Sequence, residues 1–202
     1  MSDVTTYYSQ LDGRVARRER NRTAVLDVVL EMFAEDQLFP TIEQASSRSG
    51  LSPRSVYRYF ADPGELLEAT IVRSFDQSRG VTHLHAIGAG PLEDRLQAFC
   101  ESRVRLHGVS GAVWRATVYN AARHERLRGE LEANRGRKRD QFAKQFAPEL
   151  VAMPADKHQR VLAAGDVLTQ LDSIDLLRRS NGLESDVVID VLVSALGALL
   201  RS

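Results

Sequence analysis

Hydrophobic residues recur along this chain at the spacing of α-helices. Val25, Val29, Met32 and Phe33 follow the i, i+4, i+7, i+8 pattern that gathers side chains on one helix face. This pattern predicts a first helix over about residues 15–34. No segment alternates between apolar and polar residues with the turn signals of a hairpin. The pattern therefore predicts an all-α protein.

Three further helix starts follow one another between residues 41 and 67. Thr41 and Gln44 have the spacing of a capping box, and Gly50 suits the left-handed residue that closes a short helix. Ser52 and Asp62 each place a capping side chain before a proline at the first helical position. A short helix, a turn at Gly50, a second short helix and a connecting helix form a helix-turn-helix unit.

A glycine-rich stretch without helical pattern, residues 80–91, marks a domain boundary. We expect a flexible leader at 1–13, a three-helix helix-turn-helix domain with its connecting helix at 14–80, and a helical bundle at 91–202. Helices are expected in the bundle at about 91–107, 111–126, 128–147, 155–180 and 185–201, for a total of about nine. Gly108 and Gly111 mark the expected break between the first two.

The last expected helix is apolar almost all round. Its polar positions form one narrow stripe, made by Asp186, Asp190, Ser194, Gly197 and Arg201. Such a helix must be covered on more than one side, and a dimer interface is the natural second cover. An interfacial membrane helix is the rival interpretation, but its polar face would be cationic.

Charge and composition exclude several classes of protein. The 27 cationic and 27 anionic side chains balance, which argues against a protein that coats nucleic acid through its overall charge. The single cysteine, Cys100, forms no internal disulfide and is expected to be buried and inert in a reducing compartment. The sequence has no secretory signal and no apolar run of about 18 residues. We therefore expect a cytoplasmic protein with no membrane segment.

Candidate metal and catalytic sites are weak. His83 and His85 are separated by one residue, and the other three histidines are scattered, so no metal-ligand spacing emerges. No glycine-flanked nucleophile or phosphate-binding loop is present. We expect neither an enzyme nor a bound metal or cofactor. Residues 123–144 carry eight cations against four acids. An exposed, ion-paired helix is the favoured interpretation, and an anionic ligand or partner is the alternative.

Residues 41–67 resemble the TetR family of bacterial transcriptional regulators. The resemblance rests on Thr41, on Gly50-Leu51-Ser52 at the turn, on Val56-Tyr57-Arg58-Tyr59-Phe60, and on Glu65-Leu66-Leu67. It implies that the last two long helices form a four-helix bundle between two subunits. The interface residues expected on this basis are Leu168, Leu171, Val188, Leu192, Leu196 and Leu199.

The chain departs from the family pattern at four positions. Gln37 stands where a glycine usually closes the first helix, Ala45 replaces a larger aliphatic residue, and Ser46 replaces alanine at the helix crossing. Pro63 replaces a lysine that commonly touches a phosphate, so that contact must be absent.

The resemblance implies a DNA-binding face on the helix-turn-helix. Arg54 is expected to reach guanine, Ser55 a base edge, and Tyr57 and Tyr59 the phosphates. Arg48 and Arg58 are expected to serve phosphate or base. Thr41 and Ser52 lie at helix starts, whose free N–H groups favour anions. Arg17 and Arg18 belong to a basic N-terminal stretch that either reaches the DNA or is only a solvated leader.

We expect an apolar effector pocket lined by Phe99, Trp114, Val118 and Tyr119. The sequence thus predicts a ligand-responsive regulator, a homodimeric repressor on a palindromic operator in double-stranded DNA that a small molecule releases. The alternative is a helical dimeric interaction or small-molecule-binding protein without sequence-specific DNA binding.

Overall fold

The computed structural model describes residues 2–78, 84 and 86–201, with side chains from Gly13 onward. This part of the chain contains ten α-helices, one π-helical turn and no strand, which confirms the predicted all-α class. The elements are α1 (Ser2–Ala34), α2 (Ile42–Ser49), α3 (Pro53–Tyr57), α4 (Pro63–Ser78), α5 (Leu92–Ala121), α6 (Glu125–Gln145), α7 (Ala147–Val151), α8 (Ala155–Thr169), α9 (Leu171–Asp175), η1 (Leu176–Ser180) and α10 (Ser185–Arg201).

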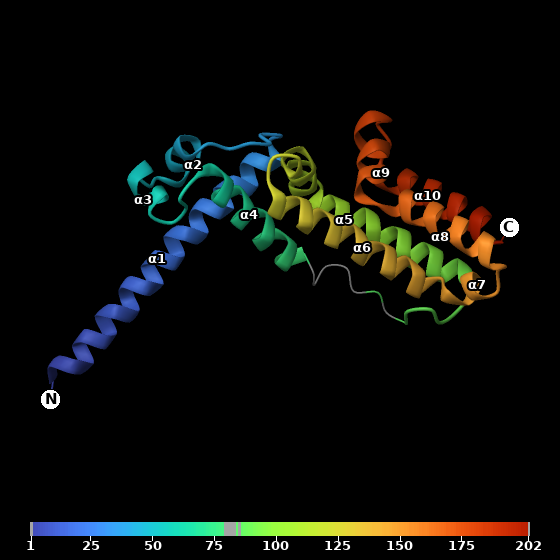
Figure 1. Ribbon diagram of the computed structural model, residues 1–202, viewed down its shortest axis with the longest axis horizontal. Helices are drawn as coiled ribbons and strands as arrows, with labels where there is room; N and C mark the ends of the chain where they lie inside the picture. The colour runs from blue at the N-terminus through green and yellow to red at the C-terminus, as the bar shows by residue number, and fades with distance from the viewer. Residues whose placement is uncertain (1, 79–83, 85, 202) are drawn as a thin grey trace.

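Two groups of helices make up the molecule (Figure 1). The helices α2 and α3 lie beside the C-terminal half of α1, and the N-terminal half of α1 projects away from them. The long helices α5 and α6 pack side by side, and α10 packs on α5 while α8 packs on α6. Because α4 contacts α1, α5 and α6, it belongs to both groups.

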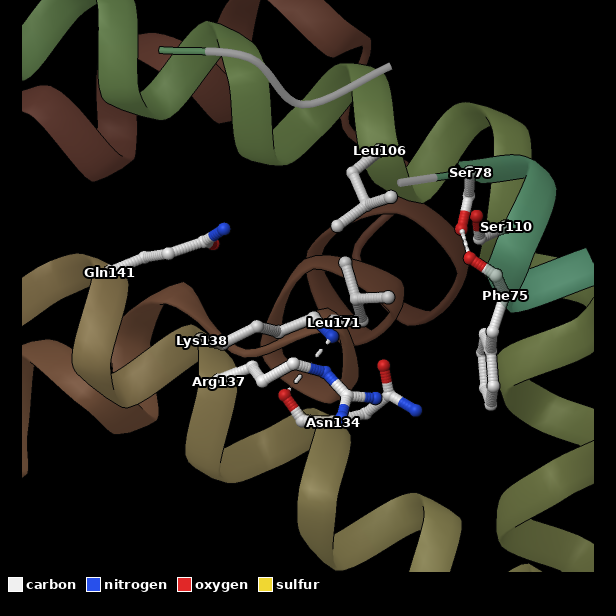
Figure 2. A pocket seen from close by; sticks show the side chains of 9 residues that line it. All are labelled: Phe75, Ser78, Leu106, Ser110, Asn134, Arg137, Lys138, Gln141 and Leu171. Atoms are coloured by element: carbon white, nitrogen blue, oxygen red, sulfur yellow. Dashed lines mark hydrogen bonds between the residues drawn. The ribbon is translucent and has the colours of Figure 1, made fainter. Parts of the chain in front are cut away.

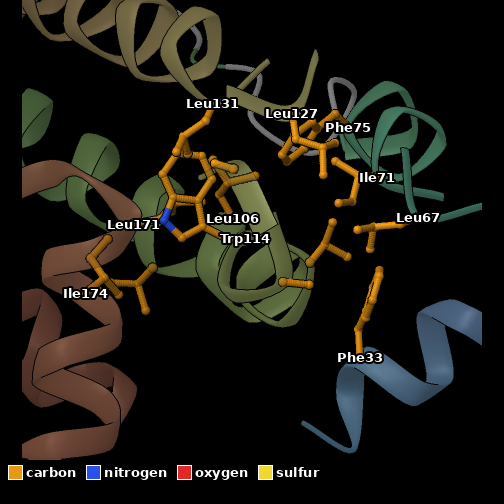
Figure 3. Close-up of a cluster of buried hydrophobic side chains, with 14 of the residues drawn as sticks. Phe33, Leu67, Ile71, Phe75, Leu106, Trp114, Leu127, Leu131, Leu171 and Ile174 are labelled. Atoms are coloured by element: carbon orange, nitrogen blue, oxygen red, sulfur yellow. The ribbon is translucent and has the colours of Figure 1, made fainter. Parts of the chain in front are cut away.

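One hydrophobic core runs through both groups (Figure 3). Phe33 of α1 lies beside Leu67 and Ile71 of α4, and this cluster continues to Trp114 of α5 and Leu127 of α6. Each of these side chains is at most 1% exposed. A displacement of α4 or α5 must therefore disturb packing on both sides of the predicted domain boundary.

The first helix begins at Ser2, earlier than the expected start near residue 15. The segment predicted as a leader is thus helical, and its flexibility stays a prediction. Asp36 takes the left-handed conformation (φ 61°) just beyond the end of α1. The N–H of Gln37 donates to the carbonyl of Met32 at 2.9 Å, and the N–H of Asp36 donates to that of Phe33 at 3.0 Å. This is a Schellman closure, with Asp36 where a glycine is usual.

The bundle differs from the expectation by one predicted break that is absent and by one break that was not predicted. The expected break at Gly108 and Gly111 is absent, since α5 is continuous from Leu92 to Ala121. A Cβ at Gly111 would lie 3.0 Å from the His107 ring, so this glycine makes room for a side chain and does not end the helix. The single helix expected over 155–180 is broken at Gln170, whose backbone is extended (φ −69°, ψ 153°).

The predicted interface on α10 is largely wrong because α5 covers that face within the same chain. Val188, Leu192 and Leu196 are at most 1% exposed, and Leu171 of α9 is equally buried. These four residues belong to the chain's own core and cannot form a contact surface. Leu168 and Leu199 are half-buried. A single apolar helix does not reveal which of its faces the same chain covers.

The predicted linker at 80–91 lies partly outside the described residues, as do His83 and His85. The domain limits at 13, 80 and 91 therefore remain predictions. Within the described chain, no helix combines the length and apolar character needed to cross a membrane.

Candidate nucleic-acid interface

The predicted capping box at the start of α2 is present. Thr41 Oγ1 accepts from the Gln44 N–H at 3.2 Å, and Gln44 Oε1 accepts from the Thr41 N–H at 2.9 Å. Gly50 takes the expected left-handed conformation at the other end (φ 69°). Both ends of this two-turn helix are thus set by local hydrogen bonds and backbone conformation, as the sequence predicts.

The turn between α2 and α3 is held by serine hydroxyls. Ser46 Oγ donates across the turn to the carbonyl of Leu51 at 2.5 Å. Ser52 Oγ accepts from the Ser55 N–H at 3.2 Å and lies 3.0 Å from the Ser55 hydroxyl. The serine that replaces alanine at the helix crossing therefore does more than fit, because it bonds the two ends of the turn together.

Asp62 caps α4 as expected. Its carboxylate accepts from the N–H of Glu65 at 2.8 Å, and Glu65 accepts in return from the N–H of Ala61 at 2.6 Å. Pro63, which lacks an N–H, sits at the first position of the helix, where that donor would have no intrahelical partner. These bonds explain why proline is tolerated here.

The short helix α3 exposes the residues predicted to meet DNA. Arg54 and Arg58 are exposed, and the Tyr57 ring is 48% exposed, while Val56 on the opposite face is fully buried in the core. Because Ser52 and Pro53 start the helix, Arg54 lies in its first turn, where Pro53 has no N–H and the Ser55 N–H is bonded to Ser52. The exposed arginines thus give this turn a positive surface.

A groove runs between α1 and the helix-turn-helix, and we call it the arginine groove. Its lining residues are Arg14, Arg17, Arg18, Asn21, Leu51, Ser55, Arg58 and Tyr59. Five of these were predicted from the sequence as DNA-binding residues: Arg17, Arg18, Ser55, Arg58 and Tyr59. The structure therefore brings the basic stretch of α1 against the side of α3.

Tyr59 lies on the inner wall of the arginine groove. Its ring is only 8% exposed, and its hydroxyl accepts from Arg58 Nη2 at 3.1 Å and from Asn21 Nδ2 at 3.4 Å. The hydrogen bond from Arg58, followed by the one from Asn21, lowers the pKa of Tyr59. The Arg58 guanidinium is also 5.3 Å from the centroid of the Tyr59 ring. These contacts orient Arg58 along the groove.

Arg48 does not join the other predicted residues. Its guanidinium donates to both carboxylate oxygens of Glu35, at 2.8 and 2.6 Å. This hydrogen bonding lowers the pKa of Glu35 and raises that of Arg48. In this conformation Arg48 closes a contact between α1 and α2, so its charge is already balanced.

The sequence placed Arg14 in the same basic stretch as Arg17 and Arg18, but Asn21 was not predicted as a member of the site. The signal was present, since positions 14, 17, 18 and 21 share one face of a helix. It was not used because the basic stretch was expected to precede the first helix, whereas α1 includes it.

The predicted effector pocket does not form as one site. Phe99 is buried against Phe142 and Phe146, with ring centroids 5.9 and 5.3 Å away. Trp114 borders a surface depression together with Val118 and Tyr119, which are 38% and 52% exposed. Phe99 has no part in that depression because it belongs to a separate aromatic cluster.

A different cavity opens between α4, α5, α6 and α9 (Figure 2). Its lining residues are Phe75, Ser78, Leu106, Ser110, Asn134, Arg137, Lys138, Gln141 and Leu171. The sequence offered no pattern for this cavity, because its residues come from four separate helices.

Cys100 is fully buried, as expected, and burial raises the pKa of its thiol to about 12. Among the described side chains, no group of three or more His, Cys, Asp or Glu is arranged to hold a metal ion.

Comparisons with known proteins agree with this geometry. No family model matches the chain. The HTH-type transcriptional regulator BetI of Escherichia coli is 34% identical over 102 residues, which cover 50% of this chain and 51% of BetI. The chain thus matches only about half the length of this curated relative.

Solved structures match over more of the chain. A TetR-family transcriptional regulator from Streptomyces coelicolor superposes with a TM-score of 0.68 and 20% identity, covering 91% of this chain and 87% of its own. A transcriptional regulator from Rhodococcus sp. Rha1 gives a TM-score of 0.67 and 15% identity, covering 91% and 96% of the two chains. The resemblance predicted at residues 41–67 is confirmed, and this chain has the fold of the TetR family of transcriptional regulators.

Proposed function

We propose that this protein is a ligand-responsive transcription regulator that binds double-stranded DNA through its helix-turn-helix. The observation that carries the proposal is the arginine groove beside the exposed face of α3. Exposed arginines at a capped helix start are suited to phosphate and base edges, and the matching relative is itself an HTH-type regulator. Such a protein would act in the cytoplasm and has no need of a catalytic site.

The exposed residues divide into two roles. Arg54 and Tyr57 would enter the major groove or meet its rim, and Arg54 is the candidate for bidentate contact with guanine. Ser55 lies where α3 meets the arginine groove and would approach a base edge. Arg17 and Arg18 would follow the phosphates beside α3 and fix the orientation of the protein.

The remaining predicted residues would contribute at the helix starts. Thr41 and Ser52 would direct the starts of α2 and α3 toward a phosphate, with the N–H groups that the capping bonds leave unpaired. Tyr59 would act by holding Arg58, since its hydroxyl is already bonded to that side chain. Arg48 would contribute only after leaving Glu35.

We further infer a homodimer that pairs through the outer faces of α8 and α10. The exposed apolar residues on these faces are Val167, Val187 and Val191, with exposures of 63%, 42% and 40%. The half-buried Leu168 and Leu199 flank them. Two-fold pairing would present two copies of α3 to a palindromic operator with half-sites about one helical turn apart.

Repression and release would depend on contacts that join the two groups of helices. Asp36, just after α1, is bonded to Arg115 of α5 at 2.9 Å and to Arg179 of η1 at 3.0 Å. Arg115 also bonds Asp175, which in turn contacts His107 at 3.0 Å. We call these side chains the Asp36 network. An effector that moves α4, α5 or η1 would change the position of α1 and hence of α3.

Fluorescence anisotropy with the DNA upstream of the protein's own gene tests the proposal. Wild type is expected to bind tightly, and binding should weaken as salt increases. Arg54→Ala should lose about tenfold or more on this DNA and little on random DNA. Arg128→Ala is the matched control, because Arg128 is an exposed arginine on α6 that does not line the arginine groove.

The absence of any DNA binding would contradict the proposal. If the protein binds neither its own upstream DNA nor any sequence selected from a random library, the proposal is wrong. The same fold would then serve as a dimeric interaction or small-molecule-binding protein without sequence-specific DNA binding.

A further inference from the structure

The cavity between α4, α5, α6 and α9 contains an unusual charge. Lys138 is only 7% exposed, yet its side chain extends into this cavity (Figure 2). Its ammonium has one weak hydrogen bond, to the carbonyl of Asn134 at 3.5 Å. It also lies 4.7 Å from the centroid of the Trp114 ring. Buried ammonium groups are normally paired with a carboxylate.

No carboxylate within the described residues lies within 4.0 Å of Lys138. The carboxylates whose charge acts on Lys138 and on Arg103 are those of Asp172 and Asp166, and both are already paired with other arginines. Asp172 bonds Arg135 at 2.9 Å, and Asp166 bonds Arg139 at 2.8 Å.

A second buried cation adds to the excess of positive charge. Arg103 is 3% exposed and donates to Gln141 Oε1 and to the carbonyl of Lys138, both at 2.8 Å. Gln141 lines the same cavity, so its amide connects Arg103 to the cavity wall. Arg103 also lacks a carboxylate partner within ion-pair distance in the described structure. The protein thus buries two positive charges side by side without balancing either of them directly.

The cavity also presents a hydroxyl with no partner. Ser110 is 1% exposed and lines the cavity, and its Oγ has no hydrogen bond within the described structure. A buried polar atom without a partner costs free energy, so such atoms usually meet a ligand or an ordered water. Ser110 comes from α5 and Lys138 from α6, and both line the same space.

We propose that this cavity is the effector site and that it binds a small organic carboxylate, with Lys138 as the counter-charge and Ser110 as a hydrogen-bond donor. Phe75, Leu106 and Leu171 would cover the apolar part of the ligand. Arg137 is exposed at the cavity and would attract the anion on its way in. This inference rests on the proposed function only in calling the ligand an effector.

The size of the cavity limits the ligand. The space is about 120 Å³, slightly less than the roughly 150 Å³ of an apolar protein cavity that binds benzene. One ammonium in the cavity balances one negative charge, which favours a monocarboxylate with a short aliphatic or single-ring body. A larger or dianionic ligand would require the surrounding helices to separate.

The site is also suited to transmit binding. Phe75 and Ser78 belong to the last turns of α4, which packs on α1 as well as on α5 and α6. The centroids of the Phe75 and Trp114 rings are 6.5 Å apart, and the Lys138 ammonium lies over the Trp114 ring. A ligand that draws Lys138 toward itself would change the packing of both aromatic rings and so of α4.

Binding should depend on pH. Burial, with contributions from Arg103, Arg137 and Arg135 that Asp172 partly offsets, lowers the pKa of Lys138 to about 7. A bound carboxylate favours the charged ammonium, so binding at higher pH requires uptake of a proton. Affinity should therefore be greatest below pH 7 and fall by up to about tenfold for each pH unit above it.

The test uses matched pairs of small probes with the full-length protein. Benzoate and hexanoate are compared with benzamide and hexanamide, which have similar shapes and no charge. Trp114 is the only tryptophan of the chain, so its fluorescence reports binding beside Lys138. Calorimetry in two buffers of different ionisation enthalpy measures the number of protons taken up on binding. It also measures affinity for those variants whose Trp114 fluorescence is altered.

Wild type is expected to bind a carboxylate at least tenfold more tightly than its amide, with proton uptake above pH 7. Lys138→Met should lose about tenfold or more in carboxylate affinity and the preference over the amide, while Ser110→Ala should lose less. Lys144→Met is the control, since Lys144 is exposed on the same helix and should leave both unchanged. Thermal melting of each variant checks its folding.

Three results would overturn the inference. These are equal affinity for carboxylates and amides, unchanged carboxylate affinity in a folded Lys138→Met, and no binding of any carboxylate at millimolar concentration. Operator binding without probe is measured separately. Protein that binds DNA but no carboxylate refutes this site alone, whereas protein that binds carboxylate but no DNA refutes the proposed regulator and leaves the site standing.

Discussion

Positive charge occurs in two very different settings in this protein. In the arginine groove, Arg14, Arg17 and Arg18 are exposed on one face of α1 and lie in water. At the cavity between α4, α5, α6 and α9, Lys138 and its neighbour Arg103 are at least nine-tenths buried, and burial lowers their pKa values to about 7 and about 10. The same kind of side chain is therefore inexpensive to keep charged in one region and costly in the other.

This difference indicates two kinds of ligand. Exposed cations interact with a polyanion through many weak contacts, each reduced by salt and none dependent on exact placement. Buried cations interact strongly with a single anion of suitable size and position, and they are destabilising when that anion is absent. The groove is suited to a DNA backbone, and the cavity is suited to a small molecule.

The largest effect is expected from removing charge in the groove. Arg17→Ala combined with Arg18→Ala should weaken DNA binding by about 10- to 100-fold near physiological salt. The plot of log affinity against log salt should become shallower by about 1.8, which corresponds to two phosphate contacts. Fluorescence anisotropy at four salt concentrations measures both quantities.

The matched control for this pair is Arg105→Ala combined with Arg128→Ala, which removes two exposed arginines outside the groove. It should change neither the affinity nor the slope by much. If both double variants reduce the slope equally, the groove arginines act only through the overall charge of the protein. The arginine groove would then not be a specific site for the DNA backbone.

The next effect concerns the stability of the buried charge. In the folded protein Lys138 loses its proton as pH rises through about 7, whereas an unfolded lysine keeps it to about 10.4. The unfolded state then binds more protons, so wild-type stability should rise with pH. Lys138→Met should be the more stable protein at pH 7, and its advantage should shrink by about 2 kcal/mol by pH 9.

Urea denaturation at fixed protein concentration, repeated from pH 6 to pH 9, measures this difference. Lys144→Met should differ from wild type by a constant amount over the same range, because Lys144 is exposed. If the difference in unfolding free energy between Lys138→Met and wild type does not change with pH, Lys138 is not a buried charge. The cavity would then have no unbalanced positive charge to attract an anion.

The region around the groove was the more predictable one, and its local bonds explain why. The caps at Thr41, Ser52 and Asp62 involve residues at most three apart, so the sequence alone specifies them. Gly50 has the positive φ that its position in the sequence implies. The arginines were recognised as a basic stretch, but their meeting with α3 needed the packing of α1.

The C-terminal region was less predictable because its features depend on contacts between distant segments. Lys138 was seen only as one of eight cations, since nothing in the pattern of α6 distinguishes a buried lysine from an exposed one. Val188, Leu192 and Leu196 were assigned to a partner subunit, although α5 covers them. Periodicity reveals that a face is apolar but not which element covers it.

A smaller effect is expected from a single hydroxyl near the groove. Ser46→Ala removes the bond from Ser46 Oγ to the carbonyl of Leu51 and should cost about 1 kcal/mol of unfolding free energy. Ser49→Ala, one turn along the same helix, removes a longer 3.3 Å bond to the carbonyl of Ser46 and should cost less. Chemical denaturation of both variants decides the order. Equal costs would mean that the bond across the turn has no special role.

The smallest change in stability is expected at Asp36, where the two regions meet. Asp36 holds a left-handed backbone conformation that costs a non-glycine residue roughly 1 kcal/mol, and its carboxylate bonds Arg115 and Arg179. Its side chain is 47% exposed, so each ion pair contributes less than about 1 kcal/mol. Asp36→Gly relieves the strain and removes both ion pairs, so the free energy of unfolding should change by less than about 1 kcal/mol.

The same substitution should have a clear effect on communication between the regions. In wild type, benzoate in the cavity should lower operator affinity, and Asp36→Gly should reduce that effect about fivefold, as expected for the loss of about 1 kcal/mol of coupling. Anisotropy titrations with and without benzoate measure the coupling. Asp36→Asn tolerates the left-handed conformation but removes the charge. If Asp36→Asn retains the coupling while Asp36→Gly loses it, backbone rigidity carries the signal. If both retain it, the signal passes through α4 and the shared core, because Phe75, Trp114 and Phe33 still connect the cavity to α1.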